Sequence, residues 1–282
     1  MRREDAPPWS DDPVGFLREL GRGPDSGFDP GAAALAFALR ERPTMPIGPY
    51  LAHFDEIADR TRIALGPTDS AAARAAALGL VVHGLFNYAG DSQTYDDQQN
   101  ADLVRVVDRR KGLPVALGII HMSVAHRLGW PLVGLAFPGH FLLMLEHDGQ
   151  RLPLDPFDGA AVLTAAGMRR ILKSVQGESA ELTAECYTPV SDRAVLLRLQ
   201  NNIKLRRLRG GDVPGALGVA EAMLAFAPDT LELVREIAMM HMRLENITDA
   251  IRHFETYLDA EQNDALRHKA AALLQELKNR LN

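Results

Sequence analysis

The sequence predicts an α+β protein, in which a mainly helical N-terminal part carries a small antiparallel sheet and is followed by an all-helical tail. Three observations lead to this prediction. Residues 28–86 contain three successive segments with helical apolar spacing, and residues 130–157 contain short apolar runs separated by turn residues. Residues 198–282 repeat their apolar pattern at a spacing of 34 residues.

We expect three parts along the chain. Residues 1–27 are rich in Pro, Gly and Asp and predict a flexible N-terminal arm. Residues 28–190 would form the α+β domain, and residues 191–282 the helical domain.

The composition is that of an ordinary globular protein, with 46% hydrophobic and 24% charged residues. A formal net charge of -6 argues against a nucleic-acid partner, because such proteins carry a basic surface. The single cysteine, Cys186, excludes an intrachain disulfide and suits a reducing compartment. The N-terminus lacks the apolar run of a signal peptide, and no run of roughly 18 apolar residues is present. We therefore expect a cytoplasmic protein without a membrane partner.

Three helices are expected before residue 87. Residues 29–42 begin with a capping Asp29 and a proline in the first turn. Residues 50–65 have amphipathic spacing, and residues 70–86 begin at a capping Asp or Ser and become apolar. His83 lies on that apolar side, so we expect a core histidine.

The polar loop at residues 87–100 superficially resembles a calcium-binding loop. Counting from Asp91, the sixth position is Asp96, where a calcium-binding helix-loop-helix needs glycine for the sharp turn. We therefore expect no calcium at this loop.

A further helix is expected at residues 114–128. Pro114 suits a first turn, because its fixed φ and missing N–H cost little there. Gly129 suits the left-handed residue that ends a helix.

Three antiparallel strands should follow this helix. Residues 130–137 form a short apolar run, and His140 opens a second run after a Pro-Gly turn. The pair Asp148 and Gly149 predicts a hairpin turn. The third strand then ends at Asp155.

This order, a helix N-terminus, then His140 at a strand start, then Asp155 in an Asp-Pro pair, resembles the transglutaminase-like family of papain-like cysteine catalysts. The resemblance implies a thiolate at the helix N-terminus, a histidine base and an orienting aspartate. It places His140 and Asp155 in the last two roles. The family's Gly-x-Cys motif falls on residues 112–114, so Pro114 stands in the position of the nucleophile.

Cys186 does not replace the missing nucleophile. It lies 31 positions after Asp155 and outside the helix-opening context that lowers the pKa of a thiol. We expect a buried structural cysteine.

The segments RRKGLPVALG, FPGHFLLML and LDPFDG resemble the bacterial SirB-type branch, in which the transglutaminase-like domain precedes tetratricopeptide-like helices. The tail agrees, since a shift of 34 residues maps Ala216 onto Ala250 and Leu224 onto Leu258. The resemblance thus assigns residues 28–190 to a transglutaminase-like domain and residues 191–282 to tetratricopeptide-like repeats.

Simpler interpretations remain for several features. His140 and Asp155 can be a structural hydrogen-bonded pair without chemistry. His121 and His126, five positions apart, do not share a helical face, so we expect no metal site and no cofactor. Two basic runs are interpreted as solvated helix ends. They consist of Arg105, Arg109, Arg110 and Lys111, and of Lys204, Arg206, Arg207 and Arg209.

Two functions follow from these residues. The preferred one is a noncatalytic regulatory module, whose former catalytic cleft holds a protein or peptide while the repeats dock a protein partner. The expected cleft residues are Pro114, Phe137, His140, Phe141, Asp155 and Phe157. The alternative is a hydrolase or acyltransferase that uses His140 and Asp155 to activate water without a cysteine.

Overall fold

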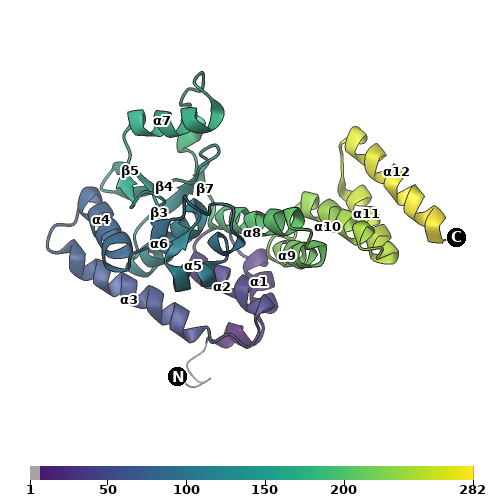
Figure 1. Ribbon diagram of the computed structural model, residues 1–282, viewed down its shortest axis with the longest axis horizontal. Helices are drawn as coiled ribbons and strands as arrows, with labels where there is room; N and C mark the ends of the chain where they lie inside the picture. Colours follow the sequence, from purple (N-terminus) through teal and green to yellow (C-terminus); the bar gives the residue numbers. More distant parts are fainter. Residues whose placement is uncertain (1–6, 282) are drawn as a thin grey trace. The chain divides into compact units, whose positions relative to one another are not determined.

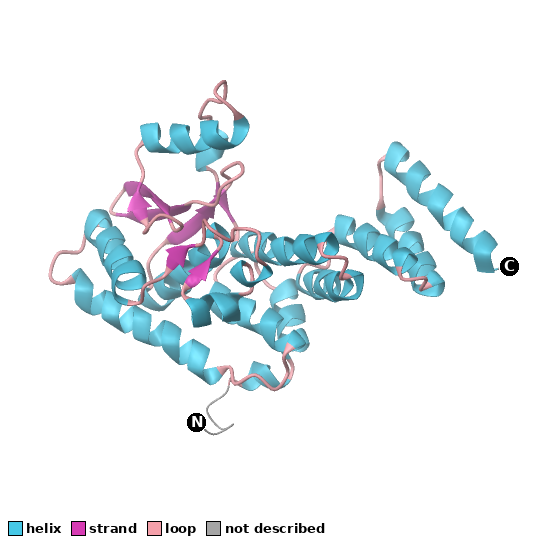
Figure 2. Ribbon diagram, in the orientation of Figure 1, coloured by secondary structure: helices cyan, strands magenta, loops and turns pink. Residues whose placement is uncertain are grey.

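The computed structural model describes residues 7–281, which fall into two compact units (Figures 1 and 2). One unit consists of the described residues up to Phe16 together with Pro24–Leu199. The other consists of Leu17–Gly23 together with the residues from Gln200 onward. Helices α1 (Pro13–Arg22) and α8 (Asp192–Arg209) each pass from one unit into the other.

The first unit is built around helix α6 (Pro114–Leu128), which is buried from Pro114 to Ala125. Helices α2 and α3 pack against it. The helices of this unit are α2 (Pro30–Glu41), α3 (Gly48–Leu65), α4 (Ala71–Leu78), α5 (Leu103–Arg109), α6 (Pro114–Leu128) and α7 (Ala165–Gln176). Short helical turns are η2 (Pro8–Asp11), η3 (Gly79–Leu85), η4 (Gln98–Asn100) and η5 (Ala184–Tyr187).

The ends of these helices follow the local signals in the sequence. The Asp29 carboxylate accepts the Gly31 N–H at 2.9 Å and so caps α2 as predicted. Gly129 ends α6 with a φ of 67°, as predicted.

Five antiparallel strands form the sheet, in the order β6-β5-β4-β3-β7. The three predicted strands are its centre, and Asp148 and Gly149 form the hairpin turn with φ of 46° and 74°. The strands are β3 (Leu132–Leu135), β4 (Leu143–His147), β5 (Gln150–Asp155), β6 (Ala161–Val162) and β7 (Pro189–Val190). A separate parallel pair joins β1 (Ala89–Gly90) to β2 (Lys111–Gly112).

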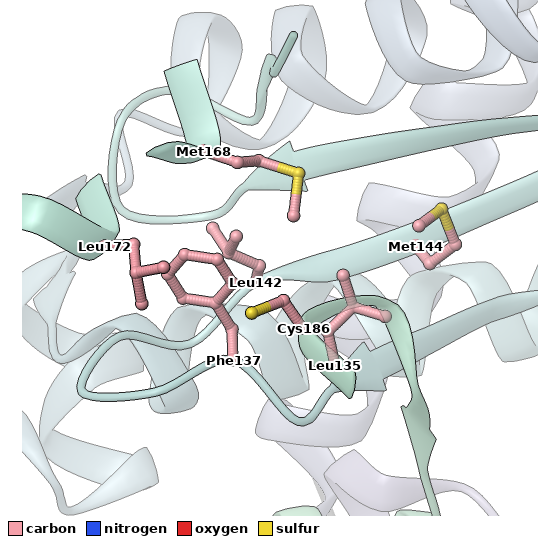
Figure 3. Close-up of a cluster of buried hydrophobic side chains, with 7 residues drawn as sticks. All are labelled: Leu135, Phe137, Leu142, Met144, Met168, Leu172 and Cys186. Atoms are coloured by element: carbon pink, nitrogen blue, oxygen red, sulfur yellow. The ribbon is translucent and has the colours of Figure 1, made fainter. Parts of the chain in front are cut away.

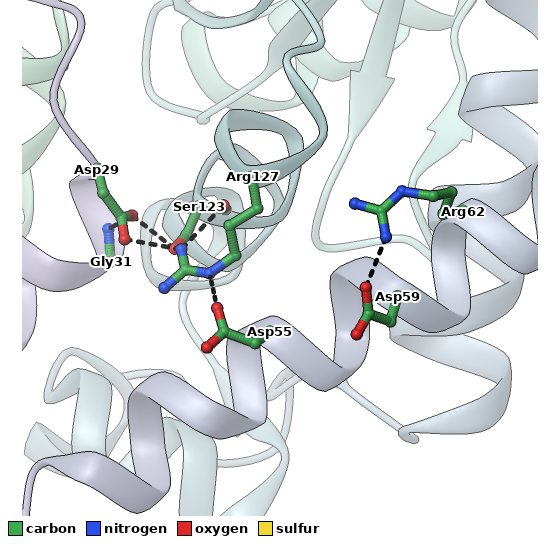
Figure 4. A network of polar contacts seen from close by, with 7 residues as sticks. All are labelled: Asp29, Gly31, Asp55, Asp59, Arg62, Ser123 and Arg127. Atoms are coloured by element: carbon green, nitrogen blue, oxygen red, sulfur yellow. Dashed lines mark hydrogen bonds and ion pairs between the residues drawn. The ribbon is translucent and has the colours of Figure 1, made fainter. Parts of the chain in front are cut away.

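An arginine at the end of α6 ties three helices together (Figure 4). The Arg127 guanidinium donates to the Asp29 carboxylate at 2.7 Å and to the Asp55 carboxylate at 2.6 Å. The Ser123 hydroxyl also donates to Asp29, at 2.6 Å. The cap of α2 and the middle of α3 are thereby fixed to α6.

The third predicted helix widens before it ends. Residues Ala71–Leu78 form the α-helix α4, but Gly79–Leu85 continue as a π-helical segment, η3. Wide turns of this kind are rare and recur at functional sites. His83 lies in this segment and is half-buried rather than fully in the core.

The second unit contains the expected helix pairs. Its remaining helices are α9 (Val213–Phe226), α10 (Leu231–Arg243), α11 (Ile247–Ala260) and α12 (Asp264–Leu281). Helices α9 and α11 begin 34 positions apart, and Ala216 and Ala250, which the repeat aligned, are both fully buried. The predicted repeat period therefore corresponds to one helix pair.

Residues 7–27, which we expected to belong to a flexible arm, contain regular structure. These residues contain α1, and Leu17 within it is fully buried. Residues 1–6 lie outside the described range. Proline and glycine at the ends of this short helix obscured its amphipathic centre.

The second basic run is a solvated helix end only in part, because Arg209 is exposed whereas Lys204 and Arg206 are buried. Lys204 is 3% exposed and forms an ion pair with Glu236, and Arg206 is 7% exposed and donates to the Asn202 side chain at 2.8 Å. Lys204 and Arg206 each have a polar partner, which is the condition under which a protein interior tolerates buried charges.

Over residues 7–281, no helix combines the length and the apolar character needed to cross a bilayer.

Candidate functional site

Helix α6 begins at Pro114, which is buried and forms the first helical residue as predicted. The preceding residues Lys111–Gly112 pair in parallel with Ala89–Gly90. This short pairing holds the start of the helix beside the loop that follows β1. Pro114 carries no nucleophilic atom, so the helix start offers no group that could form an acyl intermediate.

His140 and Asp155 lie in direct contact. The Nε2 atom of His140 lies 3.0 Å and 3.1 Å from the two carboxylate oxygens of Asp155. Asp155 is the last residue of β5, as predicted, whereas His140 lies in the loop before β4 rather than at the strand start. Both side chains are largely buried, with 17% and 8% of their area exposed.

This contact fixes the proton on His140. A carboxylate only accepts hydrogen bonds, so Nε2 carries the proton and Nδ1 presents its lone pair in the neutral ring. Within residues 7–281, Nδ1 of His140 has no hydrogen-bond partner. The nitrogen available for chemistry or for accepting a ligand hydrogen bond is therefore Nδ1.

One aromatic ring contacts this pair, and a second ring contacts the first. The backbone N–H of Phe157 donates to Asp155 Oδ1 at 2.9 Å, and the Phe157 ring meets His140 edge-on at a centroid separation of 6.2 Å. Tyr95 lies 6.1 Å beyond Phe157 and is 43% exposed. A side chain at Gly90 would collide with the Phe157 ring, so the glycine allows this packing. Gly90 of β1 thus lies directly against the Phe157 ring.

Phe141 connects His140 to helix α6. Its ring packs so closely on Gly118 that a Cβ there would lie 2.3 Å from the Phe141 Cε1 atom. Gly118 is one turn after Pro114, so the two residues lie on the same face of α6. Arg198 contacts both residues. Its guanidinium lies 5.4 Å from the centre of the Phe141 ring and donates a hydrogen bond to the His140 carbonyl oxygen at 2.8 Å.

Phe137 does not join this site. It is 2% exposed and belongs to a core cluster with Leu135, Leu142 and Cys186 (Figure 3). The expected cleft residues therefore separate into His140, Asp155 and Phe157, which meet, and Phe137 and Phe141, which are core. The left-handed turn at Gly139 reverses the chain between them.

Cys186 is buried in that same core cluster and is 4% exposed. Its sulfur lies among apolar side chains in the region covered by α7 (Figure 3). A thiol in apolar surroundings is disfavoured as a thiolate. The structure therefore places Cys186 as the structural cysteine that the sequence predicts.

A second histidine pair lies in the same unit. Nδ1 of His83 lies 2.7 Å from the Tyr88 carbonyl oxygen, and Nδ1 of His121 lies 2.8 Å from that of Leu117. Both Nδ1 atoms therefore donate, and the two Nε2 atoms face each other at 3.2 Å. Burial lowers the pKa of His83, and the negative charge of Asp155 opposes this shift. Burial and the neighbouring ring lower the pKa of His121 to about 3.

Two residues of the site were not predicted. Tyr95 lies in the polar loop at residues 87–100, where an aromatic residue among Asp and Gln was the available signal. Arg198 lies in α8, and its role depends on a contact with His140 58 positions away, for which the sequence has no local signal. The Asp91 carboxylate of that polar loop accepts the Thr94 N–H and an Arg109 guanidinium N–H.

Among residues 7–281, no three His, Cys, Asp or Glu side chains gather as ligands of a metal ion.

Comparison with protein families now assigns the fold. Residues 49–201, more than half of the chain, match the family model described as "Transglutaminase-like superfamily". The chain belongs to the transglutaminase-like superfamily. Residues 203–275 match the model described as "Tetratricopeptide repeat". The predicted combination of a transglutaminase-like core with tetratricopeptide-like helices is confirmed.

Bacterial relatives agree with this assignment. A UPF0162 protein of Xylella fastidiosa (strain Temecula1) is 32% identical over 174 residues, which cover 61% of this chain and 62% of the relative. A UPF0162 protein of Vibrio cholerae is 30% identical over 198 residues, 70% of this chain and 72% of the relative. Protein SirB1 of Salmonella typhimurium is 30% identical over 144 residues, 51% and 53%. The match spans less than two thirds of the Xylella relative.

The transglutaminase-like core of this chain thus keeps two of the three catalytic positions that the resemblance implies. Pro114 begins the helix at the nucleophile's position, and the one cysteine of the chain lies elsewhere. His140 and Asp155 lie at hydrogen-bond distance from each other.

Proposed function

We propose that this transglutaminase-like protein is a noncatalytic regulatory module that binds a protein or peptide. The observation that carries the proposal is that Pro114 begins α6, where the resemblance places the nucleophile, while the His140–Asp155 contact is intact. A covalent acyl route needs a nucleophile, and proline supplies none. What remains is His140, whose Nδ1 atom can accept a hydrogen bond. The Asp155 carboxylate holds its ring at Nε2, and the Arg198 guanidinium holds its backbone carbonyl.

A peptide backbone suits the groups at this site. Nδ1 of His140 accepts a hydrogen bond, and a backbone N–H donates one. Phe157 and the partly exposed Tyr95 offer aromatic faces beside it. Aromatic side chains with one polar partner are the usual centre of a protein interface.

The tetratricopeptide unit supports a protein partner. Helical repeats of this kind stack into extended surfaces that bind other proteins. In this chain α9–α12 supply these repeats, and their interior is packed by apolar side chains such as Phe254 and Tyr257, both fully buried. The repeats would dock the partner while the His140 site engages a segment of it.

Site-specific crosslinking tests the binding role. A photoreactive phenylalanine derivative at position 95 is expected to capture a partner, and His140→Ala in the same chain should reduce the yield at least severalfold. His126→Ala is the matched control, because His126 is exposed on α6 and should leave the yield unchanged. Equal capture by the His140 and His126 variants would contradict the proposal.

Turnover assays test the alternative hydrolase or acyltransferase. A glutamine-amide peptide library should release no ammonia and incorporate no amine with the wild-type chain. Turnover that disappears in His140→Ala would instead establish that the pair activates water.

A further inference from the structure

A second polar site lies in the first unit, in a cavity of about 420 Å³. Its lining combines apolar and polar side chains, namely Pro46, Pro49, Tyr50, His53, Val107, Asp108 and Arg110. This volume is within the range of small-molecule sites. None of the lining residues belongs to the His140 site, so the inference does not depend on the proposed function.

Arg110 occupies a backbone conformation that normally favours glycine. It follows the last residue of α5 with a φ of 59°. A non-glycine residue in this left-handed region costs free energy, and such positions concentrate at ligand sites. This strained backbone position therefore places an arginine side chain at the cavity.

The Arg110 guanidinium is held so that one edge stays available. Its Nη1 atom donates to the Tyr88 hydroxyl at 2.7 Å and to the Val107 carbonyl, and the group stacks 4.9 Å from the Tyr88 ring. Among residues 7–281, Nε and Nη2 have no hydrogen-bond partner. This Nε–Nη2 edge is the one that binds a carboxylate through two parallel hydrogen bonds.

A neighbouring histidine is held as a neutral donor. Tyr88 is buried, and its hydroxyl lies 3.0 Å from Nε2 of His53, which is the acceptor available to the hydroxyl proton. Nε2 then accepts, so the ring proton of His53 is on Nδ1. Burial and the charge of Arg110 lower the pKa of His53 to about 4, so the ring stays neutral at pH 7.

The remaining lining residues define the ligand. Pro46, Pro49 and Val107 supply apolar walls, and the Asp108 carboxylate makes several negative charges on a ligand unfavourable. We propose that this cavity binds an apolar molecule with one carboxylate, such as a free amino acid or the C-terminus of a peptide. The carboxylate pairs with the free edge of Arg110, and Nδ1–H of His53 gives a further hydrogen bond.

Calorimetry with matched probes tests this site on the full chain. N-acetyl-L-leucine is expected to bind at least tenfold more tightly than N-acetyl-L-leucinamide, which lacks the charge. Backbone NMR shifts on binding should concentrate at residues 46–53 and 107–110. A tetrapeptide ending in leucine that binds as well as N-acetyl-leucine indicates a peptide C-terminus, and one that binds more weakly indicates a free amino acid.

Arg110→Gly is the decisive variant, because glycine accepts the φ of 59° without strain and the fold should survive. We expect at least a tenfold loss of N-acetyl-leucine binding. Arg105→Gln, at an exposed position of α5, is the control and should bind as the wild type does. Equal binding of acid and amide, no binding of either, or wild-type binding by folded Arg110→Gly would overturn the proposal.

Discussion

Lowering the pH from 7 to 5 should destabilise the transglutaminase-like unit through His121. This ring is completely buried in α6, and burial together with the neighbouring His83 lowers its pKa to about 3. An unfolded histidine has a pKa of about 6.5, so the unfolded chain binds the proton first. The stability contributed by the neutral ring is complete above pH 6.5 and is lost as the pH falls toward 3.

The size of the effect follows from these two pKa values. At pH 5 the unfolded ring is protonated and the folded ring is not. The difference between the unfolded pKa of about 6.5 and pH 5, about 1.5 units, sets the size of the effect. At about 1.36 kcal/mol per unit, the free energy of unfolding should fall by about 2 kcal/mol between pH 7 and pH 5. His53, whose pKa burial lowers to about 4, adds to the loss in the same direction.

Urea unfolding followed by tryptophan fluorescence measures this loss in the relevant unit. The chain contains two tryptophans, Trp9 and Trp130, and both belong to the first unit. In His121→Gln the fall in unfolding free energy between pH 7 and pH 5 should shrink by about 2 kcal/mol, since the titrating group is gone. His126→Gln, exposed on the same helix, should retain the wild-type slope.

A wild-type profile that is flat between pH 7 and pH 5 would refute the reasoning. A proton shared between the facing Nε2 atoms of His83 and His121 would produce that profile, because the folded pair would already hold the proton that the unfolded chain takes up. Parallel profiles for the wild type and His121→Gln would refute it as well.

Three further predictions concern single contacts. Pro114→Cys places a thiol in the first turn of α6, where the helix dipole favours the thiolate. Iodoacetamide should therefore alkylate this thiol about tenfold faster at pH 6.5 than it alkylates Cys186 of the wild type, as measured by mass spectrometry. Equal alkylation rates would count against an active-site environment at the start of α6. Gly118→Ala puts a Cβ 2.3 Å from the Phe141 ring and should lower the urea-unfolding free energy by roughly 1–3 kcal/mol, whereas an unchanged value would show that the ring can move freely. Glu236→Gln leaves Lys204 buried without its partner and should lower the melting temperature measured by circular dichroism more than Lys204→Met does; the reverse order would contradict the account of this pair.

Local signals in the sequence predicted the elements whose ends have a specific chemistry. Helix α6 runs from Pro114 to the left-handed Gly129, and the Asp148–Gly149 turn joins β4 to β5. Both depend on backbone conformations that few residue types accept, so the residues themselves mark the positions. The fold class itself followed from the spacing of apolar residues and from the 34-residue repeat.

Elements that depend on distant contacts could not be predicted in this way. Strand β7 has two residues, and its pairing with Gly134 and Leu135 connects positions more than 50 apart along the chain. Its sequence is too short to show a strand pattern. Helix α7 was not predicted, and neither was its packing in the core cluster that contains Cys186. The sequence from α7 to Cys186 contains no motif that indicates this packing.

The candidate site was predicted in its polar part and not in its aromatic part. His140 and Asp155 were found because the pair has a recognisable order along the chain. Phe137 was expected beside them, but the turn at Gly139 directs it into the core. Tyr95 contributes instead, from a loop more than 40 positions earlier. The order of residues identifies a pair, whereas the surrounding surface depends on how loops fold over it.

The short segment Leu17–Gly23 has a practical consequence for handling this protein. It belongs to the helical-repeat unit, where Leu17 is fully buried and Gly21 lies against the carbonyl oxygens of Ala225 and Phe226. The helical-repeat unit therefore contains residues that precede the transglutaminase-like sequence as well as residues that follow it. Removing the chain from Gln200 onward would expose the apolar side of α1 and invite aggregation. To express the repeats as a separate protein, α1 would have to be joined to them through a linker. A fragment that simply begins at Gln200 would lack part of the unit.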